Sequence, residues 1–452
     1  MAAENDLGRD NIKKLVIRIA VPSMLAQFVS VLYSIVDRMY IGNIPVSGDM
    51  ALAGAGVCGP VVTMIGSVAF LVGIGGAPLM SMKMGQGDNK AAERILANCF
   101  LMLALCSVLM VACIYPIRIP MLRYFGASDT TLPYANAYFT IYLTGTVFAL
   151  MSTGMNQFII CQGFAKTGML SVLIGAVCNI VLDPVFIFGM HMGVRGAALA
   201  TVISQACSTI WVLAFLAGKK TRLKIRLRNM GLTPSVILPC VALGAATFVM
   251  QSSESIISIC FNSSLLKYGG DIAVGAMTIL TSVMQFAMLP LQGIAQGAQP
   301  ISSYNYGAKN ADRVKKTFRL LLITCLSYSV LLWAAVQLVP RVFVSIFTAD
   351  TSLIEFTAPM LKIYLGGLFL FGIQIACQMT FTSLGKAVNS IIVAVVRKFV
   401  LLIPLIYIMP HMISDSTTGV YMAEPIADIT AVIFTSVLFT FQFKKALAEI
   451  QN

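Results

Sequence analysis

Long apolar segments alternate with short polar segments along the whole of this 452-residue chain. Each apolar segment has about 20 residues or more, which lets a helix cross a hydrocarbon core of roughly 30 Å. A helix also satisfies its backbone hydrogen bonds within its own segment, as lipid demands. Twelve such segments can be distinguished. The pattern therefore predicts an all-α polytopic membrane protein with twelve transmembrane helices.

Six of the predicted spans precede the longest basic segment of the chain and six follow it. The first six cover residues 12–40, 51–82, 92–115, 134–161, 170–190 and 193–217. We interpret residues 219–233 as a basic cytoplasmic linker between an N-terminal six-helix lobe, residues 1–218, and a C-terminal six-helix lobe, residues 234–452. The apolar run after the polar first ten residues is too long for a cleaved signal peptide, so we expect it to remain as the first span.

The second half of the chain repeats the first. A shift of 222 positions aligns like residues, and a small insertion then raises the shift to 226. The aligned pairs are Gly85 with Gly307, Phe125 with Phe347, Tyr142 with Tyr364, Leu143 with Leu365, Gly163 with Gly385, and Gly193 with Gly419. Internal repeats of this kind are typical of secondary transporters, whose binding sites lie near the membrane midplane between or within the repeats.

Charged residues are scarce and unevenly placed. The chain is 58% hydrophobic and 11% charged, with a mean hydropathy of +0.87 and a net charge of +13. With both termini cytoplasmic, about 22 of the 31 Lys and Arg residues fall in cytoplasmic segments and about five outside, as the positive-inside rule expects. The charge thus indicates topology, and no soluble domain is present to offer it to nucleic acid. A multi-pass protein of a bacterial-type inner (plasma) membrane is predicted.

The sequence lacks the motifs of several enzyme and cofactor classes. Eleven cysteines lie almost wholly in apolar segments without a CxxC spacing, which argues against a disulfide framework or a zinc site. His191 and His411 fall in predicted external loops. No Walker pattern occurs, so ATP is not expected to drive the protein. Gly269-Gly270-Asp271 superficially resembles an aspartyl-protease motif but falls in a predicted loop, so neither enzyme activity nor a cofactor is predicted.

One apolar segment, residues 170–190, contains an amide and a carboxylate one helical turn apart. Asn179 and Asp183 are at positions i and i+4, which places both on the same face of a helix. Inserting an ionisable side chain at that depth of the membrane costs about 2.5–3.5 kcal/mol on insertion scales, so such a side chain is rarely found without an interaction partner or a functional role. This pair is the first candidate for a functional site.

Six short sequences in the chain, taken with the internal repeat, resemble those of the multidrug and toxic compound extrusion (MATE) family over nearly the whole length. They are IVDRMYIG at 35–42, GQGD at 85–88, NIVLDP at 179–184, GAALAT at 196–201, QPISSYNYG at 299–307 and EPIAD at 424–428. The resemblance implies a secondary exporter that expels amphipathic, often cationic compounds in exchange for Na+ or H+. A flippase for lipid-linked precursors, from the same superfamily, is the alternative, and it predicts a more basic central cavity.

The resemblance is strongest to the DinF-like branch, and it implies a cation site in the N-terminal lobe. The matching residues are Asp37, Asn179, Asp183 and Thr201, and the bend of the first span is matched by Pro22. Another branch uses a Glu on the seventh span with an acid on the tenth. Glu254 matches the first of these, but the tenth span has Lys362 and neither Asp nor Glu.

The four candidate residues suit a small cation. Two carboxylates in one apolar pocket cannot both stay ionised cheaply, and a proton or a bound Na+ relieves their repulsion. Asn179 and Thr201 add neutral oxygens, which a hard metal ion needs and a proton does not. We therefore favour Na+ at this site, with H+ as a competitor. Pro22 lacks a backbone N–H and gives the first span a place to bend.

Each candidate also has a purely structural interpretation. Alone, Asp37 is a hydrated carboxylate near a span end, Asp183 belongs to a helix break, and Asn179 is an interhelical hydrogen-bonding group, as is Thr201. Glu254 is either a substrate or second-ion ligand or a satisfied polar contact. Glu424 and Asp428 line or stabilise the C-terminal lobe. Arg397 and Lys398 either snorkel or pair with Glu424 or Asp428, and we expect the pairing.

Adaptable side chains in both lobes are candidates for a substrate cavity, because Met and aromatic surfaces repack around differently shaped drugs. The residues proposed for it are Gln157, Glu254, Gln285, Gln299, Tyr142 and Tyr364. The expected partners are small amphipathic or cationic drugs and the lipid bilayer, and the expected assembly is a monomer.

Overall fold

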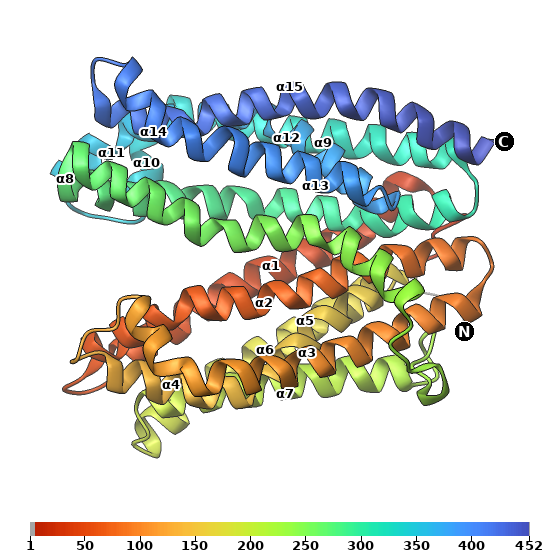
Figure 1. The fold of residues 1–452 in the computed structure, drawn as a ribbon, viewed down its shortest axis with the longest axis horizontal. Helices are drawn as coiled ribbons and strands as arrows, with labels where there is room; N and C mark the ends of the chain where they lie inside the picture. The colour runs from red at the N-terminus through yellow and green to blue at the C-terminus, as the bar shows by residue number, and fades with distance from the viewer. Residues whose placement is uncertain (1–4, 452) are drawn as a thin grey trace.

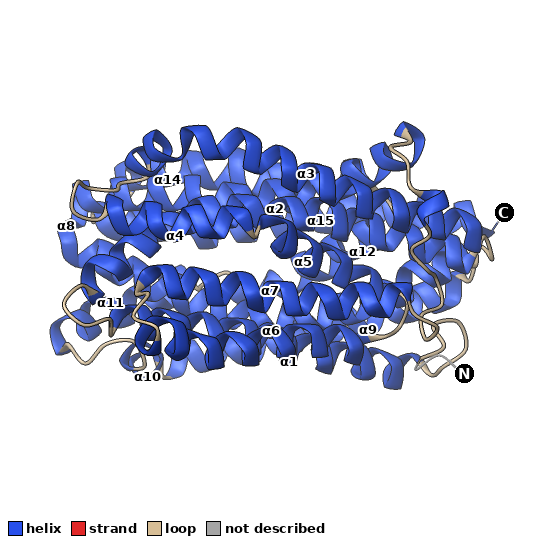
Figure 2. Cartoon of the chain, turned by 90° about the horizontal axis from the view of Figure 1, so that it is seen from below, coloured by secondary structure: helices blue, strands red, loops and turns tan. Residues whose placement is uncertain are grey.

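The computed structural model describes residues 5–451, and every regular element in that range is a helix (Figure 2). The first half contains α1 (Ile12–Gly42), α2 (Gly48–Gly85), α3 (Asn89–Tyr124), α4 (Leu132–Thr144), α5 (Thr146–Cys161), α6 (Ala165–Pro184) and α7 (Val194–Ala217). The second contains α8 (Pro234–Gly307), α9 (Ala311–Leu338), α10 (Pro340–Ser345), α11 (Thr351–Tyr364), α12 (Leu368–Ser383), α13 (Ala387–Val395), α14 (Ile403–Met412) and α15 (Ser416–Gln451). Short π-helices, Val185–Gly189 and Val396–Leu402, follow α6 and α13.

The predicted twelve-span all-α fold is confirmed. Nine helices of residues 5–451 are long and apolar enough to cross a membrane, and the bent pair α11 and α12 makes a tenth. The remaining two spans come from α4 with α5, which Gly145 separates, and from α8, whose 74 residues break at Gly270. Gly270 has φ +68, a left-handed conformation that glycine adopts without steric cost.

One loop prediction holds at a single residue and another is wrong. The predicted loop at Gly269-Gly270-Asp271 is reduced to Gly270, whose non-helical backbone links the two helices that make up α8. His411 lies in the last turn of α14 and not in a loop. In both places the flanking apolar runs extend the helices further than the polar residues suggested, because tertiary packing outweighs the local preference for a turn. His191 does lie outside a helix, with φ +53.

The helices form two groups that meet along α2 and α8. Figure 1 shows α1–α7 on one side and α9–α15 on the other, with both chain termini at the same end. At that end the groups come into backbone contact at two glycines. A Cβ atom on Gly85 would lie 2.0 Å from the Tyr304 carbonyl oxygen, and one on Gly307 would lie 2.0 Å from that of Met82. The 222-residue repeat relates these two contacts, so the groups meet symmetrically.

The repeat also recurs in the turns at this end. Gly87 and Lys309 both have positive φ, +79 and +57. The next residue in each turn, Asp88 or Asn310, accepts a hydrogen bond from a backbone N–H in the first turn of the following helix. The same turn therefore starts α3 and α9. The division into lobes at residues 218 and 234 stays a prediction, although residues 218–233 are largely non-helical.

Candidate cation site and adjoining cavity

The four residues predicted to bind a cation lie together. Asn179 and Asp183 come from α6, Asp37 from α1 and Thr201 from α7. The Asn179 Nδ2 atom lies 3.4 Å from Asp183 Oδ1 and 3.4 Å from Thr201 Oγ1. The carboxyl groups of Asp37 and Asp183 lie close enough to interact with each other. Residues far apart in the sequence thus form one oxygen-rich cluster.

Several oxygens of this cluster are buried and have no donor. Asp183 and Asn179 are 0% and 1% exposed. Within residues 5–451, no hydrogen-bond partner reaches Asp37 Oδ1, Asn179 Oδ1 or Asp183 Oδ2. A buried acceptor without a partner costs free energy, and such groups in a folded protein call for an explanation. A positively charged species bound among these atoms would explain why they have no donor.

The chemistry of the cluster suits a hard monovalent cation or a proton. It offers carboxylate, amide and hydroxyl oxygens, which are the ligands that hard cations prefer. No group of three or more His, Cys, Asp and Glu side chains able to hold a metal ion occurs in the described range of 5–451. The four residues offer only carboxylate, amide and hydroxyl groups, which fit Na+ or H+ better than a transition metal that prefers imidazole or thiolate.

Local structure of α6 and α7 positions the cluster. Pro184 has no N–H, and the helix does not break after it but widens into the π-helix Val185–Gly189. Gly196 lets α7 approach this π-helix, since a Cβ there would lie 2.7 Å from the Phe186 carbonyl carbon. Five residues later, Thr201 faces Asn179 and donates its own proton to the Ala197 carbonyl oxygen at 3.0 Å.

Two tyrosines beside the cluster were not identified from the sequence. The Tyr138 side chain of α4 lies close to Thr201, and its ring stacks on Tyr142 with centroids 6.3 Å apart. Tyr33 lies four residues before Asp37 on α1, close enough to interact with its charge. The i, i+4 spacing could have identified Tyr33. Tyr138 carries no such signal, because helix packing alone brings α4 to Thr201.

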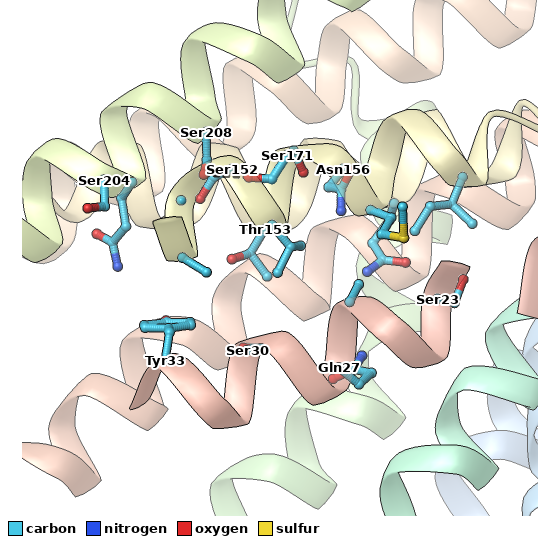
Figure 3. A pocket seen from close by; sticks show the side chains of 18 of the residues that line it. Ser23, Gln27, Ser30, Tyr33, Ser152, Thr153, Asn156, Ser171, Ser204 and Ser208 are labelled. Atoms are coloured by element: carbon cyan, nitrogen blue, oxygen red, sulfur yellow. Dashed lines mark hydrogen bonds between the residues drawn. The ribbon is translucent and has the colours of Figure 1, made fainter. Parts of the chain in front are cut away.

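A cavity of about 190 Å³ adjoins the cluster inside the first group of helices. Asn179, Thr201 and Gln157 belong to its wall. Tyr33, which Figure 3 labels, lines it as well. Among the residues proposed for the substrate cavity, only Gln157 lines this space. The other five, which the structure does not bring to it, are Tyr142, Glu254, Gln285, Gln299 and Tyr364.

The second group of helices holds a cluster of ion pairs. Arg397, in the π-helix after α13, lies 2.8 Å from Asp428 Oδ1 and 3.2 Å from Glu424 Oε1 on α15. Lys398 lies 2.8 Å from Glu254 Oε1 on α8. The pairing expected for Arg397 with Glu424 and Asp428 is thus observed. Lys398 pairs instead with Glu254, because the packing of α8 against the second group brings that carboxylate to it.

Comparison with known proteins identifies the family. The MatE family model matches residues 22–185 and residues 245–408, one block in each half of the chain. The chain belongs to the MatE family. The two blocks agree with the internal repeat found in the sequence, and the predicted resemblance to MATE transporters is confirmed.

Curated MatE relatives span almost the whole chain. The multidrug export protein MepA of Staphylococcus haemolyticus (strain JCSC1435) is 23% identical over 437 residues, which cover 97% of this chain and 95% of the relative. MepA of Staphylococcus aureus (strain NCTC 8325 / PS 47) is 22% identical over 415 residues, covering 92% and 90%. The similarity therefore includes both halves of the repeat.

Solved MATE structures share the fold. One described as MATE in the bent conformation matches with a TM-score of 0.92 at 22% identity and covers 99% of this chain and 98% of its own. Another, an outward-facing conformation of a multidrug resistance MATE family transporter, matches with a TM-score of 0.90 at 22% identity and the same coverage. At this identity the match establishes the fold.

Proposed function

We propose that this MatE protein is a secondary active exporter that expels amphipathic, often cationic compounds in antiport with Na+ or H+. One observation carries the proposal. Asp37 and Asp183, from two different membrane helices, share a buried cluster in which oxygens of both lack a donor. The curated MepA relatives, which are named multidrug export proteins, support the assignment of drugs as substrates.

The cluster couples charge to conformation. Asp37, Asn179, Asp183 and Thr201 would hold the cation, whose charge offsets the repulsion between the two carboxylates. Moving one charge inward down a membrane potential releases about 2.3 kcal/mol per 100 mV, which is enough to bias an equilibrium between two states. Asp37 lies on α1, which contains Pro22 and so lacks one backbone hydrogen bond. We propose that α1 bends there when the charge on Asp37 changes, as the DinF-like resemblance implies.

We assign the end that carries both termini to the cytoplasm of a bacterial-type plasma membrane. The basic segment 219–228 lies there, and positive charge accumulates on the cytoplasmic side of membrane proteins. This orientation makes the two glycine contacts, Gly85 with Tyr304 and Gly307 with Met82, a closure of the cytoplasmic side. The protein would work as a monomer, because each chain has both halves of the repeat.

The exporter is favoured over the lipid flippase by the charge of the cavity. A flippase for lipid-linked precursors is expected to present Lys or Arg to anionic head groups. The wall of the cavity in the first group of helices contains none of the four charged residue types. Uncharged hydroxyl and amide groups suit neither a phosphate nor a pyrophosphate as a primary partner.

The experiment uses purified protein in sealed vesicles with a Na+ or an H+ gradient imposed alone. Asp37→Asn and Asp183→Asn should each lower gradient-driven ethidium export at least about 100-fold, because the one carboxylate that remains attracts a cation much less strongly than two. Asp49→Asn, an exposed acid in the first turn of α2, is the matched control and should export normally.

Wild-type coupling in a folded Asp37→Asn or Asp183→Asn variant would remove that residue from the mechanism. Export under only one of the two gradients would identify the coupling ion. Scrambling of lipid-linked precursors without ethidium export would instead support the flippase.

A further inference from the structure

Three stripes of mostly polar residues run through the first group of helices and end at the cation cluster. Spacings of three or four residues, with Ser204 and Gln205 adjacent to each other, place each stripe on one side of its helix. All of these residues line the cavity, and Figure 3 shows several of them converging on it from different helices. The stripes are Ser23, Gln27, Ser30 and Tyr33 on α1, Ser171, Gly175 and Asn179 on α6, and Thr201, Ser204, Gln205 and Ser208 on α7.

The cavity has room for water and a small ion beside the cluster. Its volume of about 190 Å³ can hold several water molecules. Its hydroxyl and amide groups both donate and accept hydrogen bonds. Because the wall contains no charged side chain, an ion would bind there weakly enough to leave again, as ion conduction requires.

Unpaired atoms in the wall mark places for water or an ion. Asn156 is 7% exposed, and its Oδ1 atom has no partner within residues 5–451. The Gln205 Oε1 atom on α7 also has no hydrogen-bond partner within that range. Buried water typically makes hydrogen bonds to such otherwise unsatisfied groups.

The end of the cavity away from the cluster is sealed by apolar side chains. Ile160 and Ala165 form part of the cavity wall and also belong to a small apolar cluster. That cluster contains Leu7, which precedes the first helix and is 0% exposed. Its other buried members are Leu15, Val16, Ile19, Ala20 and Ile301. Leu7 therefore lies between the cavity and the end of the molecule that carries the termini.

Hydrogen bonds to both groups of helices hold Leu7 in place. We call residues 5–10 the strap. On the side of the first group, Asn5 donates to the Gly163 carbonyl oxygen at 2.8 Å, and Arg222 donates to the Asn5 carbonyl oxygen at 2.9 Å. The strap is thereby anchored beside the cavity.

The second group holds the same strap through its carbonyl oxygens. Asn305 donates to that of Leu7 at 2.9 Å, and Arg313 donates to those of Leu7 and Asp10 at 3.1 and 2.9 Å. Arg313 is also bonded to Asn305 Oδ1 at 3.0 Å. Separation of the two groups at this end would break these bonds and free the strap from the second group.

We propose that the cavity is a hydrated path for the coupling cation between the cluster and the cytoplasmic end, and that the strap is its gate, with Leu7 as the seal. The inference rests on the proposed function and adds the route of the ion. In the structure described here the gate is closed. When the two groups of helices separate at the cytoplasmic end, the strap loses Asn305 and Arg313, and Leu7 withdraws from the apolar cluster.

The gate is tested by the accessibility of a cysteine in the path. Ser30→Cys, in a background where the eleven native cysteines are replaced, is exposed to a membrane-impermeant methanethiosulfonate reagent from the cytoplasmic side. Arg313→Gln and Leu7→Ser should each raise the labelling rate about tenfold, since either change removes interactions worth about 1.4 kcal/mol or more. Arg9→Gln is the control, because its exposed side chain lies in the strap and takes part in none of these bonds.

Unchanged labelling in both Arg313→Gln and Leu7→Ser, with both proteins folded, would overturn the gate. Faster labelling in Arg9→Gln as well would show that any change to the strap has this effect, which also contradicts a specific seal.

The path is tested by removing its polarity. Gln27→Leu with Gln205→Leu keeps side-chain size and should lower the rate of Na+- or H+-coupled export about tenfold or more, because an apolar path sheds its water. Cation binding to the cluster, measured as stabilisation of the purified protein by Na+ or by lower pH, should stay as in the wild type.

A wild-type export rate in this double variant, while Asp183→Asn abolishes export, would overturn the path and leave the proposed function standing. Wild-type export in Asp183→Asn would instead count against the proposed function itself.

Discussion

The two halves of this MatE protein share a fold but treat buried acids in opposite ways. In the first half, Asp37 and Asp183 form no salt bridge within residues 5–451 and lie beside a polar cavity. In the second half, Glu424 and Asp428 are both bonded to Arg397. One half thus leaves its carboxylates open to an external partner, and the other satisfies them internally.

The internal repeat shows where the difference arises. A shift of 222 residues places Arg397 and Lys398 on Gly175 and Ala176, which line the cavity of the first half. Two of the smallest side chains leave space there, whereas two long cationic ones fill the corresponding stretch. The same repeated fold therefore holds a site able to bind an ion in the first half. In the second half it holds a site whose carboxylates are neutralised by the chain's own cations.

Breaking the Arg397 network should have the largest effect on stability. Arg397→Leu leaves Glu424 and Asp428 buried without a cation, which costs about 3–5 kcal/mol, whereas Asp183→Asn should be close to neutral because it removes a repelled charge. Unfolding of the purified proteins, followed by heat or denaturant, measures both. Arg397→Leu with Glu424→Leu and Asp428→Leu is the matched control and should recover most of the loss. Equal stability of Arg397→Leu and Asp183→Asn would abolish the contrast between the halves.

Thr201→Ala should have an intermediate effect, and on ion binding instead of stability. Loss of one neutral oxygen should lower the apparent affinity for Na+ in Na+-driven export about tenfold, which corresponds to about 1.4 kcal/mol of binding free energy. A proton needs only a carboxylate, so H+-driven export should change little. Export measured against Na+ concentration and separately against pH tests this, with Thr209→Ala on the same helix as the control. An equal loss under both gradients would count against direct ligation by Thr201.

Lys398→Met should have the smallest effect. Its partner, the Glu254 side chain, is 55% exposed and can hydrate when the ammonium is lost, so the free energy of unfolding should fall by less than about 1 kcal/mol. Export under a gradient should persist, because Lys398 lies outside the cation cluster. A loss as large as that of Arg397→Leu, measured in the same unfolding assay, would show that both pairs in the second half behave as fully buried ones.

Local sequence patterns were sufficient for much of the fold and for the first-half site. Span length is fixed by the thickness of the bilayer, so apolar runs predicted twelve helices. The i, i+4 spacing placed Asn179 beside Asp183, and the resemblance to the MATE family added Asp37 and Thr201. The same patterns placed His411 in a loop and made the loop at Gly270 longer than it is, since a short polar stretch does not decide whether packed helices continue through it.

What the sequence by itself determined is therefore everything set within one helix: the spans, their repeat and the residues sharing a face. Only the tertiary structure decided which faces meet. It brought Tyr138 to Thr201, gave Lys398 to Glu254, and laid Leu7 between the cavity and the chain ends. The physical reason is that a helix fixes spacing along its own axis through local hydrogen bonds, whereas contacts between helices depend on how closely their side chains allow them to pack.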